Sequence, residues 1–462
     1  MLFNSLHFAF FFPVVLAGHW SLGPKARPWW LLAASVYFYA AYRPAYLLVL
    51  GALILVDYYA ALALARRRGT PRVALLWVSV ALNMGALGLF KYHDFAVASL
   101  GLSLPPLGWE LPLGLSFHTF QSLGYVIDVY RGREPERDLR RYALFVMFWP
   151  QLVAGPIERA SGLLAQLAAP PRPAYADAVR GLQLMAWGFF LKLAVGDRLA
   201  PYASAAYADP RAVNGAALLV GTVFFAFQIY ADFCGYSLIA IGAARAMGYR
   251  LAVNFSAPYF AASLADFWRR WHVSLSSWFR DYLYFPLGGS RVPFHRELLN
   301  LLVVFALSGL WHGASWTFVA WGLWHGLGLC AERAAARAGV PAPPRWVRVP
   351  LTFAFVTAGW VFFRAASLED AFIVFFKVAR ADLLAELPAA LRSFDLPGAE
   401  LVFALAGVAA TLAVDLARRG AGLRERVARL PAPARWAFYY AAVAALLLLG
   451  RFDERPFIYF QF

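Results

Sequence analysis

Four of the chain's eight histidines lie in one stretch, residues 263–326, where apolar bulk and titratable groups coincide. His272 lies among arginines and tryptophans, and His312 and His325 are each the centre of a WHG triplet in apolar sequence. An imidazole at hydrocarbon depth is costly unless it faces a cavity or a partner, so its first interpretation is functional. With a reference pKa of about 6.5, imidazole accepts a proton at neutral pH and returns it, which suits activation of a hydroxyl for acyl transfer.

Acyl transfer also needs a hydrogen-bond donor for the developing oxyanion. A second imidazole, a tryptophan N–H, an asparagine or a backbone N–H could supply it. His272 and His312 are separated by 40 positions, so only the fold can bring them together. The residue types alone leave His312 equally open as a buried helix-end residue, and His272 as an interfacial partner of a carboxylate or a lipid phosphate.

Other polar residues in apolar surroundings have simpler interpretations. His325 and His118 are expected to pack within the core. Asp232, beside Gly235, is expected to cap or to pair locally with Arg245 or Arg250.

The elements that must position these residues are membrane helices. The 462 residues are 61% hydrophobic, 17% aromatic and only 15% charged, well above the apolar content of soluble domains. Apolar runs near the roughly 20 residues that cross a bilayer recur along the chain. We therefore predict a single all-α polytopic domain, residues 1–462, with about eleven transmembrane helices plus re-entrant and interfacial helices.

The net charge of +16 comes from arginines in short loops between apolar runs. This pattern indicates membrane orientation and contact with anionic lipid, not nucleic-acid binding. The basic loops RRRGTPR (residues 66–72) and RGREPERDLRR (residues 131–141) are expected in the cytoplasm, which places the N-terminus in the periplasm or outside. The first apolar run lacks a basic n-region, so we expect a retained helix and not a signal peptide.

Four segments are not predicted to be regular spanning helices. Residues 142–157 contain Pro150, Gly155 and Pro156, which predicts a broken or re-entrant helix. Residues 263–291 carry too many charges to span, and they suit an interface or the wall of a wet cavity. Residues 91–110 are predicted to be a loop, and residues 365–397 have no clear assignment.

Motifs for several other chemistries are absent from the sequence. It contains no GxSxG, P-loop, HExxH or dinucleotide fingerprint, and its two cysteines have no metal-ligand spacing. We expect no metal site. Apart from the paired WHG triplets there is no internal repeat, which gives no support to a transporter built from inverted repeats.

Two long motifs resemble the membrane-bound O-acyltransferase family, in its branch that acetylates bacterial polysaccharides such as alginate. They are FWRRWHVSLSSWFRDYLYFPLGG (residues 267–289) and SGLWHGASWTFVAWGLWHG (residues 308–326). The segments AGPIER, QIYADFCGYSLIAIG, NFSAPY and the terminal YFQF extend the resemblance over nearly the whole chain. Cys234, Leu238 and His118 depart mildly from the family pattern.

The resemblance implies a ring of helices around a central funnel or tunnel in the bacterial inner membrane. It implies that His312 is the catalytic histidine and that His272 faces it across the cavity. It further implies that acetyl-CoA is the cytoplasmic acyl donor, with no permanently bound cofactor, and that a periplasmic protein accepts the acetyl group or modifies the polymer. Further candidates to line the cavity are Trp311, Asn300, Arg269, Asp281 and Asp232.

The predicted function is therefore O-acetylation of an exported, alginate-like polysaccharide. Alternatives are acylation of peptidoglycan, cellulose or teichoic acid by the same chemistry. A different class of function, a non-catalytic transporter or polymer-export channel, is disfavoured by the two histidine motifs.

Overall fold

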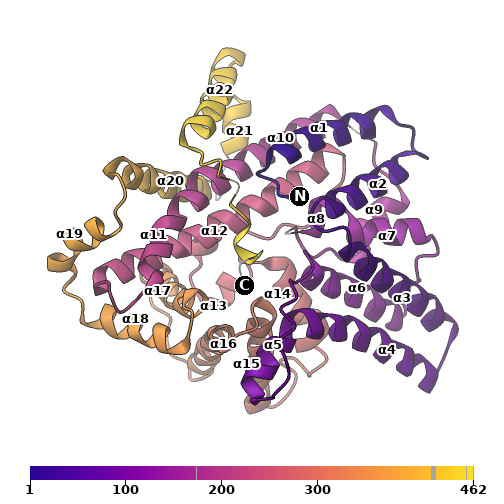
Figure 1. Cartoon of the computed structure of the whole chain (residues 1–462), viewed down its shortest axis with the longest axis horizontal. Coiled ribbons are helices and arrows are strands. Elements are labelled where there is room, and N and C mark those ends of the chain that lie inside the picture. The colour runs from indigo at the N-terminus through magenta and orange to yellow at the C-terminus, as the bar shows by residue number, and fades with distance from the viewer. Residues whose placement is uncertain (154, 173, 418–422, 454, 461–462) are drawn as a thin grey trace. The chain divides into compact units, whose positions relative to one another are not determined.

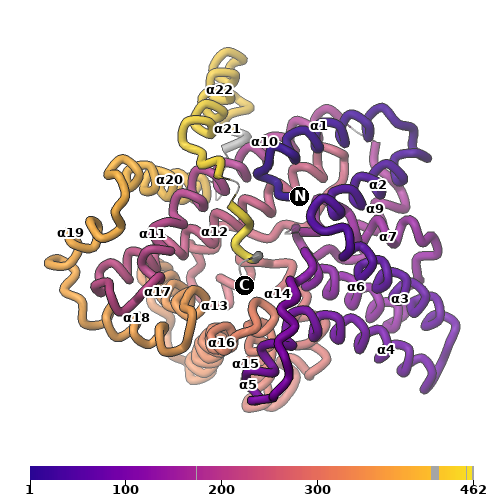
Figure 2. The backbone as a smooth tube through the Cα atoms, in the orientation of Figure 1, coloured from indigo at the N-terminus to yellow at the C-terminus, as the bar shows by residue number. Residues whose placement is uncertain are grey.

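The computed structural model describes residues 1–153, 155–172, 174–417, 423–453 and 455–460 (Figure 2). Within these residues every regular element is a helix, which confirms the all-α prediction (Figure 1). Among the described residues, eight helices are long and apolar enough to cross a membrane, and Leu6–Ser21 is a shorter apolar helix. These helices confirm a polytopic membrane protein, while the count of about eleven crossings stays a prediction.

The chain divides into two compact units. The first comprises Met1–Met185, Ser237–Val253 and Ser277–Leu283, and the second comprises Ala186–Tyr236, Asn254–Ser276 and Tyr284–Phe462. Three helices, α10 (Tyr175–Phe189), α12 (Gly215–Ala246) and α14 (Val273–Phe279), have residues in both units.

The first unit contains the N-terminal helices. They are α1 (Leu6–Ser21), α2 (Arg27–Ala40), α3 (Tyr46–Arg66), α4 (Thr70–Leu87), α5 (His93–Leu100), α6 (Leu115–Tyr130), α7 (Leu139–Met147), α8 (Trp149–Leu152) and α9 (Ala165–Ala168). The carboxylate of Asp57 on α3 is buried and accepts hydrogen bonds from Ser79 (2.6 Å) and Asn83 (2.9 Å) on α4. A polar group buried in a membrane helix thus has its partners on the neighbouring helix.

The predicted loop at residues 91–110 begins later than expected. From α4 the chain continues through a π-helical turn, Gly88–Tyr92, directly into α5. No proline or glycine interrupts residues 89–100, and the helix ends only at Gly101, which adopts the left-handed conformation with φ 62°. Such a glycine is a common helix terminator because it has no side chain to strain.

The predicted broken helix within residues 142–157 is confirmed. Helix α7 ends at Met147, Phe148 leaves the helical region with φ −50° and ψ 106°, and Pro150 follows at the start of the four-residue α8. The amide of Gln151 donates to the carbonyl of Phe145 at 2.7 Å. A side chain therefore satisfies one of the backbone groups that the break leaves without a helical partner.

The second unit contains the remaining helices, including the two that carry the WHG triplets. They are α11 (Asp197–Ala208), α13 (Leu264–Trp268), α15 (Phe294–His312), α16 (Trp316–Arg337), α17 (Arg345–Arg364), α18 (Leu368–Arg380), α19 (Leu383–Ser393), α20 (Gly398–Ala417), α21 (Leu423–Ala428) and α22 (Ala432–Leu449). The unassigned residues 365–397 form α18 and α19. Each begins at a side-chain cap, supplied by Ser367 and Asp382 respectively.

Helices α15 and α16 form a tight hairpin, and they lie side by side in Figure 1. A Cβ atom on Gly309 would lie 2.1 Å from the carbonyl oxygen of Phe318, and one on Gly322 would lie 2.1 Å from that of Phe305. The two helix backbones therefore approach at a pair of glycines, as small residues permit in membrane helix packing.

Replacing Gly322 by alanine is expected to destabilise the protein by about 1–3 kcal/mol, because the added methyl group must displace the backbone of α15. Thermal unfolding in detergent measures this effect. Gly85→Ala on α4 is the matched control, since no atom lies within 4 Å of its added Cβ. We expect this control to be neutral or slightly stabilising. Equal unfolding temperatures for the two variants would contradict the close approach.

Candidate active site

His312 is the last residue of α15 and is only 3% exposed. The helix ends there because Gly313 is extended, and Ser315 then caps the start of α16. The imidazole is surrounded by aromatic rings. Its ring contacts, by centroid separation, are Trp321 at 4.9 Å, Trp311 at 5.0 Å, Tyr459 at 5.4 Å and Phe363 at 5.5 Å.

His272 lies in the turn between α13 and α14 and is fully buried. Its φ of 43° places it in the left-handed region, which is uncommon for a residue with a side chain. Residues held in this region cost free energy and tend to occur at functional sites. The fold therefore maintains an unfavourable backbone conformation at one of the two histidines predicted to be catalytic.

Asn254, in the NFSAPY segment, holds the backbone after His272 in place. Its carbonyl accepts the N–H of Val273 at 3.1 Å, and its side-chain oxygen accepts the hydroxyl of Ser274 at 2.7 Å. Asn254 and Ser274 are both buried. These hydrogen bonds hold the backbone that follows His272 and compensate part of the strain there.

The short helix α13 before His272 is anchored at its N-terminus. Glu332 on α16 accepts the backbone N–H of Leu264 at 2.6 Å, and the Ser263 hydroxyl accepts that of Asp266 at 3.0 Å. A carboxylate at a helix N-terminus satisfies unpaired N–H groups and complements the helix dipole. Through this contact α16, which carries the second WHG triplet, also positions the turn at His272.

The left-handed backbone at position 272 makes the stability effect of a substitution depend on its shape. His272→Val is expected to be less stable than His272→Asn by about 1–2 kcal/mol in free energy of unfolding, because asparagine tolerates positive φ and a β-branched residue does not. His272→Val should therefore unfold at the lower temperature. Thermal unfolding of the two purified variants measures this difference. If valine is tolerated as well as asparagine, the positive φ is not retained in the protein.

The fold brings His272 and His312 together. Their ring centroids lie 6.3 Å apart with an interplanar angle of 61°. Trp311 contacts both rings, since its centroid lies 6.0 Å from that of His272. Two buried imidazoles at this separation can hold one polar reacting group between them, with one as proton acceptor and the other as hydrogen-bond partner.

The C-terminal segment forms another wall of this site. It runs beside α12 in yellow, down to the label C (Figure 1). The ring of Tyr459 lies 4.7 Å from that of Phe233, which itself lies 4.7 Å from His272. Phe457 stacks on Tyr236 at 4.7 Å. The C-terminal segment thus contacts His312 directly through Tyr459 and is linked to His272 through Phe233 of α12.

A buried charge cluster fastens this segment to α12. The Lys192 ammonium lies 2.8 Å from the carboxylate of Asp197 and 2.8 Å from that of Asp232. The other oxygen of Asp232 accepts the backbone N–H of Ile458 at 2.8 Å. Because buried charges must be paired, Lys192 and its two carboxylates hold each other and the C-terminal backbone in one arrangement.

The prediction that Asp232 pairs with Arg245 or Arg250 is wrong. Asp232 pairs with Lys192, and Arg245 pairs with Asp177 at 2.6 Å. Helix α12 runs without interruption from Gly215 to Ala246, so 13 residues of helix separate Asp232 from Arg245. That is about 20 Å at 1.5 Å per residue, too far for an ion pair.

The other candidates for the cavity lining have different surroundings. Asn300 donates to the carbonyls of Leu287 (3.1 Å) and Gly289 (3.3 Å). Arg269 is largely exposed and lies 3.6 Å from Asp266. Asp281 belongs to the first unit, where Arg159 lies 3.1 Å from its carboxylate. Their roles in binding stay predictions.

The remaining predicted packing histidines are fully enclosed. His325 lies among rings, with centroids 5.0 Å from Trp268 and 5.1 Å from Trp321. His118 on α6 is 1% exposed and lies 3.4 Å from the hydroxyl of Ser122. The two WHG triplets therefore place their histidines differently: among the described residues, the ring of His312 contacts that of His272, whereas His325 contacts Trp268 and Trp321.

A model of the family described as MBOAT, membrane-bound O-acyltransferase, matches residues 136–369, which include both histidines and both WHG triplets. The chain belongs to the membrane-bound O-acyltransferase family. It is therefore a multi-pass membrane enzyme of the O-acyltransferase class.

Relatives in this family carry acyltransferase names. The chain is 39% identical over 390 residues to "Probable alginate O-acetylase AlgI" of Pseudomonas aeruginosa, an alignment that covers 80% of this chain and 73% of the relative. It is 34% identical to the "Peptidoglycan O-acetyltransferase" of Helicobacter pylori, over 80% of this chain and 78% of that protein. It is 29% identical to the "Teichoic acid D-alanyltransferase" of Streptococcus thermophilus, over 49% of this chain and 57% of that protein.

Three residues at this membrane-bound O-acyltransferase site were not among the candidates from the sequence. They are Asn254, Lys192 and Tyr459. Lys192 was detectable as a lone cation in an apolar run, which requires a buried carboxylate partner. Nothing in the local sequence of Asn254 or Tyr459 indicates that they meet residues of other elements.

Proposed function

We propose that this enzyme acetylates an exported, alginate-like polysaccharide. The donor is acetyl-CoA from the cytoplasm, and the acetyl group reaches the polymer through a periplasmic partner protein. The observation that carries this proposal is the buried pair His272 and His312, 6.3 Å apart, in a chain whose relatives include proteins named as alginate O-acetylases. The family membership supplies the reaction class, and the names of the relatives favour the substrate class.

In the proposed reaction His312 is the general base. A hydroxyl oxygen of the acceptor attacks the thioester carbonyl, and its proton passes to an imidazole nitrogen of His312. The new ester bond forms as the carbon–sulfur bond breaks, and His312 returns the proton to the departing thiolate. His272 orients or polarises the reacting group, because its buried ring faces the same space.

The enclosing rings have a role in this proposal. Trp311, Trp321 and Phe363 cover His312 and leave it 3% exposed. Exclusion of water protects the acyl group from hydrolysis and strengthens the electrostatic interactions in the site. The acceptor hydroxyl then attacks the acyl carbon without competition from water.

Peptidoglycan is the second candidate acceptor. The relative named as a peptidoglycan O-acetyltransferase is aligned over 80% of this chain, an equal share to that of the alginate relative of Pseudomonas aeruginosa. Both candidates use one reaction and differ in the polymer that receives the acetyl group. The site residues do not distinguish them, so the acceptor must be measured directly.

The test uses the full-length enzyme in lipid nanodiscs together with its co-purified periplasmic partner. Radiolabelled acetyl-CoA is added, followed by alginate oligosaccharides in one sample and peptidoglycan fragments in another. We expect label in the alginate sample and none when His312 is replaced by alanine. Label only in the peptidoglycan sample would overturn the alginate proposal, and absence of transfer from acetyl-CoA with any acceptor would overturn the donor.

A further inference from the structure

A cavity of about 570 Å³ lies in the first unit, where α3 ends, α4 begins and the connection from α6 to α7 passes. Its apolar lining is Leu62, Ala65 and Val129, and its charged lining is Arg66, Arg72, Arg133, Arg137 and Glu134; Gly132 and Pro135 complete it. Four arginines against one carboxylate leave an excess of positive charge. We call this cavity the arginine pocket. The proposed acetyl transfer assigns it no role.

Two of the arginines are held in place by neutral groups. Arg72 donates to the carbonyl of Tyr130 at 2.6 Å, and its guanidinium lies 5.0 Å from the centre of the Tyr130 ring. Arg133 donates to the carbonyl of Ala160 at 3.0 Å. These contacts fix the guanidinium groups without cancelling their charge. The Nε of Arg72 is buried and has no hydrogen-bond partner among the described residues.

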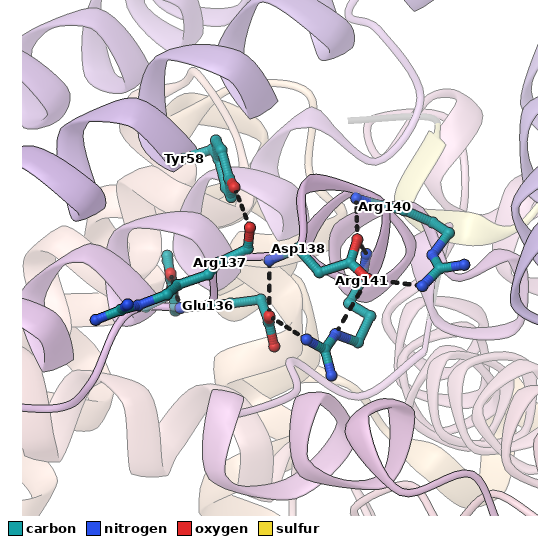
Figure 3. Close-up of polar contacts among 7 residues, drawn as sticks. Tyr58, Glu136, Arg137, Asp138, Arg140 and Arg141 are labelled. Carbon is teal, nitrogen blue, oxygen red and sulfur yellow. Dashed lines mark hydrogen bonds and ion pairs between the residues drawn. The ribbon is translucent and has the colours of Figure 1, made fainter.

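Among the described residues, the guanidinium of Arg137 has no ion pair, because the neighbouring carboxylates pair with other arginines. The Asp138 carboxylate lies 2.7 Å from Arg140, and the Glu136 carboxylate lies 3.0 Å from Arg141. Figure 3 shows the Arg137 side chain extending away from this network. The two carboxylates next to Arg137 in the sequence are thus occupied by other arginines, and its charge is available in the pocket.

The wall that carries Arg137 is tied to two helices. The hydroxyl of Tyr58 on α3 donates to the carbonyl of Arg137 at 2.6 Å (Figure 3). The hydroxyl of Tyr125 on α6 accepts the N–H of Glu136 at 2.9 Å. These hydrogen bonds order the connection at the position where it lines the cavity, so the pocket is a built feature of the fold.

The pocket lies at the ends of two candidate membrane spans, Tyr46–Arg66 and Thr70–Leu100. Helix ends of this kind lie at the depth of lipid headgroups. Basic pockets between membrane helices bind anionic headgroups, and the planar guanidinium group matches the oxygens of a phosphate. The volume is also in the range of small-molecule sites.

We propose that the arginine pocket is a phosphate-binding site, with the headgroup of an anionic phospholipid as the occupant that its position at the helix ends favours. Leu62, Ala65 and Val129 then contact the glycerol end of the lipid, while the arginines bind the phosphate. A soluble phosphate ester carries the same phosphate group and is the alternative occupant.

The test compares two double variants of the full-length protein that lose the same charge. Arg66→Gln with Arg137→Gln removes two lining arginines, neither of which has a side-chain hydrogen bond or ion pair within the described residues. Arg67→Gln with Arg68→Gln removes two exposed arginines of the same loop that do not line the pocket. Native mass spectrometry in detergent measures binding of phosphatidylglycerol and of phosphatidylcholine.

We expect the wild-type protein to retain phosphatidylglycerol in preference to phosphatidylcholine. The lining variant should bind it about thirtyfold more weakly, and the control variant should stay within about twofold of wild type. An equal loss in both variants would show general attraction of a basic surface and overturn the pocket site.

The second part of the test uses two soluble ligands, inorganic phosphate and coenzyme A, each added without lipid. One outcome is that the wild type and the control variant bind one of these soluble ligands, the lining variant does not, and phosphatidylglycerol is not preferred. This outcome would support the phosphate site and overturn the lipid as its occupant. If none of these ligands binds in a manner dependent on Arg66 and Arg137, the proposal fails entirely. The acetyl-transfer assay is independent of this outcome because it reports on His312.

Discussion

Replacing His312 by alanine is expected to lower the rate of acyl transfer by a factor of about 10² to 10⁴, the contribution of a positioned general base. The physical reason is that, among the described residues, His272 is the other imidazole in ring contact with His312, and Asn254 holds the backbone that follows it. The measurement is the initial rate of label transfer from acetyl-CoA, normalised to folded protein. The abundance of the variant in the membrane should remain close to wild type.

His325→Ala is the matched control, because it removes the same side chain from the second WHG triplet. His325 is fully buried among the rings of Phe267, Trp268 and Trp321. Its removal leaves a cavity, so we expect a lower unfolding temperature, with the rate per folded molecule largely retained. A transfer rate that survives in His312→Ala, or an equal loss of rate in His325→Ala at an unchanged unfolding temperature, would contradict the assignment.

Replacing Lys192 by methionine is expected to cost about 3–5 kcal/mol in stability, the usual penalty for removing one partner of a buried ion pair. The substitution leaves Asp197 and Asp232 buried without their shared cation. It should also release the backbone at Ile458, which Asp232 holds, and so loosen the wall that Tyr459 forms beside His312. Thermal unfolding in nanodiscs reports the first effect, and the transfer rate of the remaining folded protein reports the second.

Asp232→Asn should be milder, because Lys192 keeps Asp197 and the amide oxygen can still accept the N–H of Ile458. The double variant Lys192→Met with Asp232→Asn should lose less stability than the sum of the losses in the two single variants, since it removes one buried charge of each sign. Additive effects would show that the two side chains do not interact. A transfer rate unaffected in every folded variant would show that the cluster stabilises the fold without positioning the site.

The sequence by itself determined the class of protein and much of its local structure. Apolar runs of bilayer length specify helices, because backbone polar groups in lipid must be satisfied within the segment. Pro150 and Phe148 interrupt the helix near the predicted break, and the charges of residues 263–291 exclude a spanning helix, which the short helices α13 and α14 confirm. Helix α5 was missed because the loop was predicted to begin at residue 91, although no residue before Gly101 ends the helix.

Only the tertiary structure decided which polar residues share a site. The sequence singled out His312 and His272 by type and by their surroundings, yet their proximity depends on how α13, α14 and α15 pack. The positive φ of His272 and the pairing of Asp232 with Lys192 were likewise not visible in local sequence. The contact of Asp232 with Ile458 joins residues 226 positions apart. Local patterns report the periodicity and end points of helices, whereas a buried charge or imidazole obtains its partner from whichever distant element packs against it.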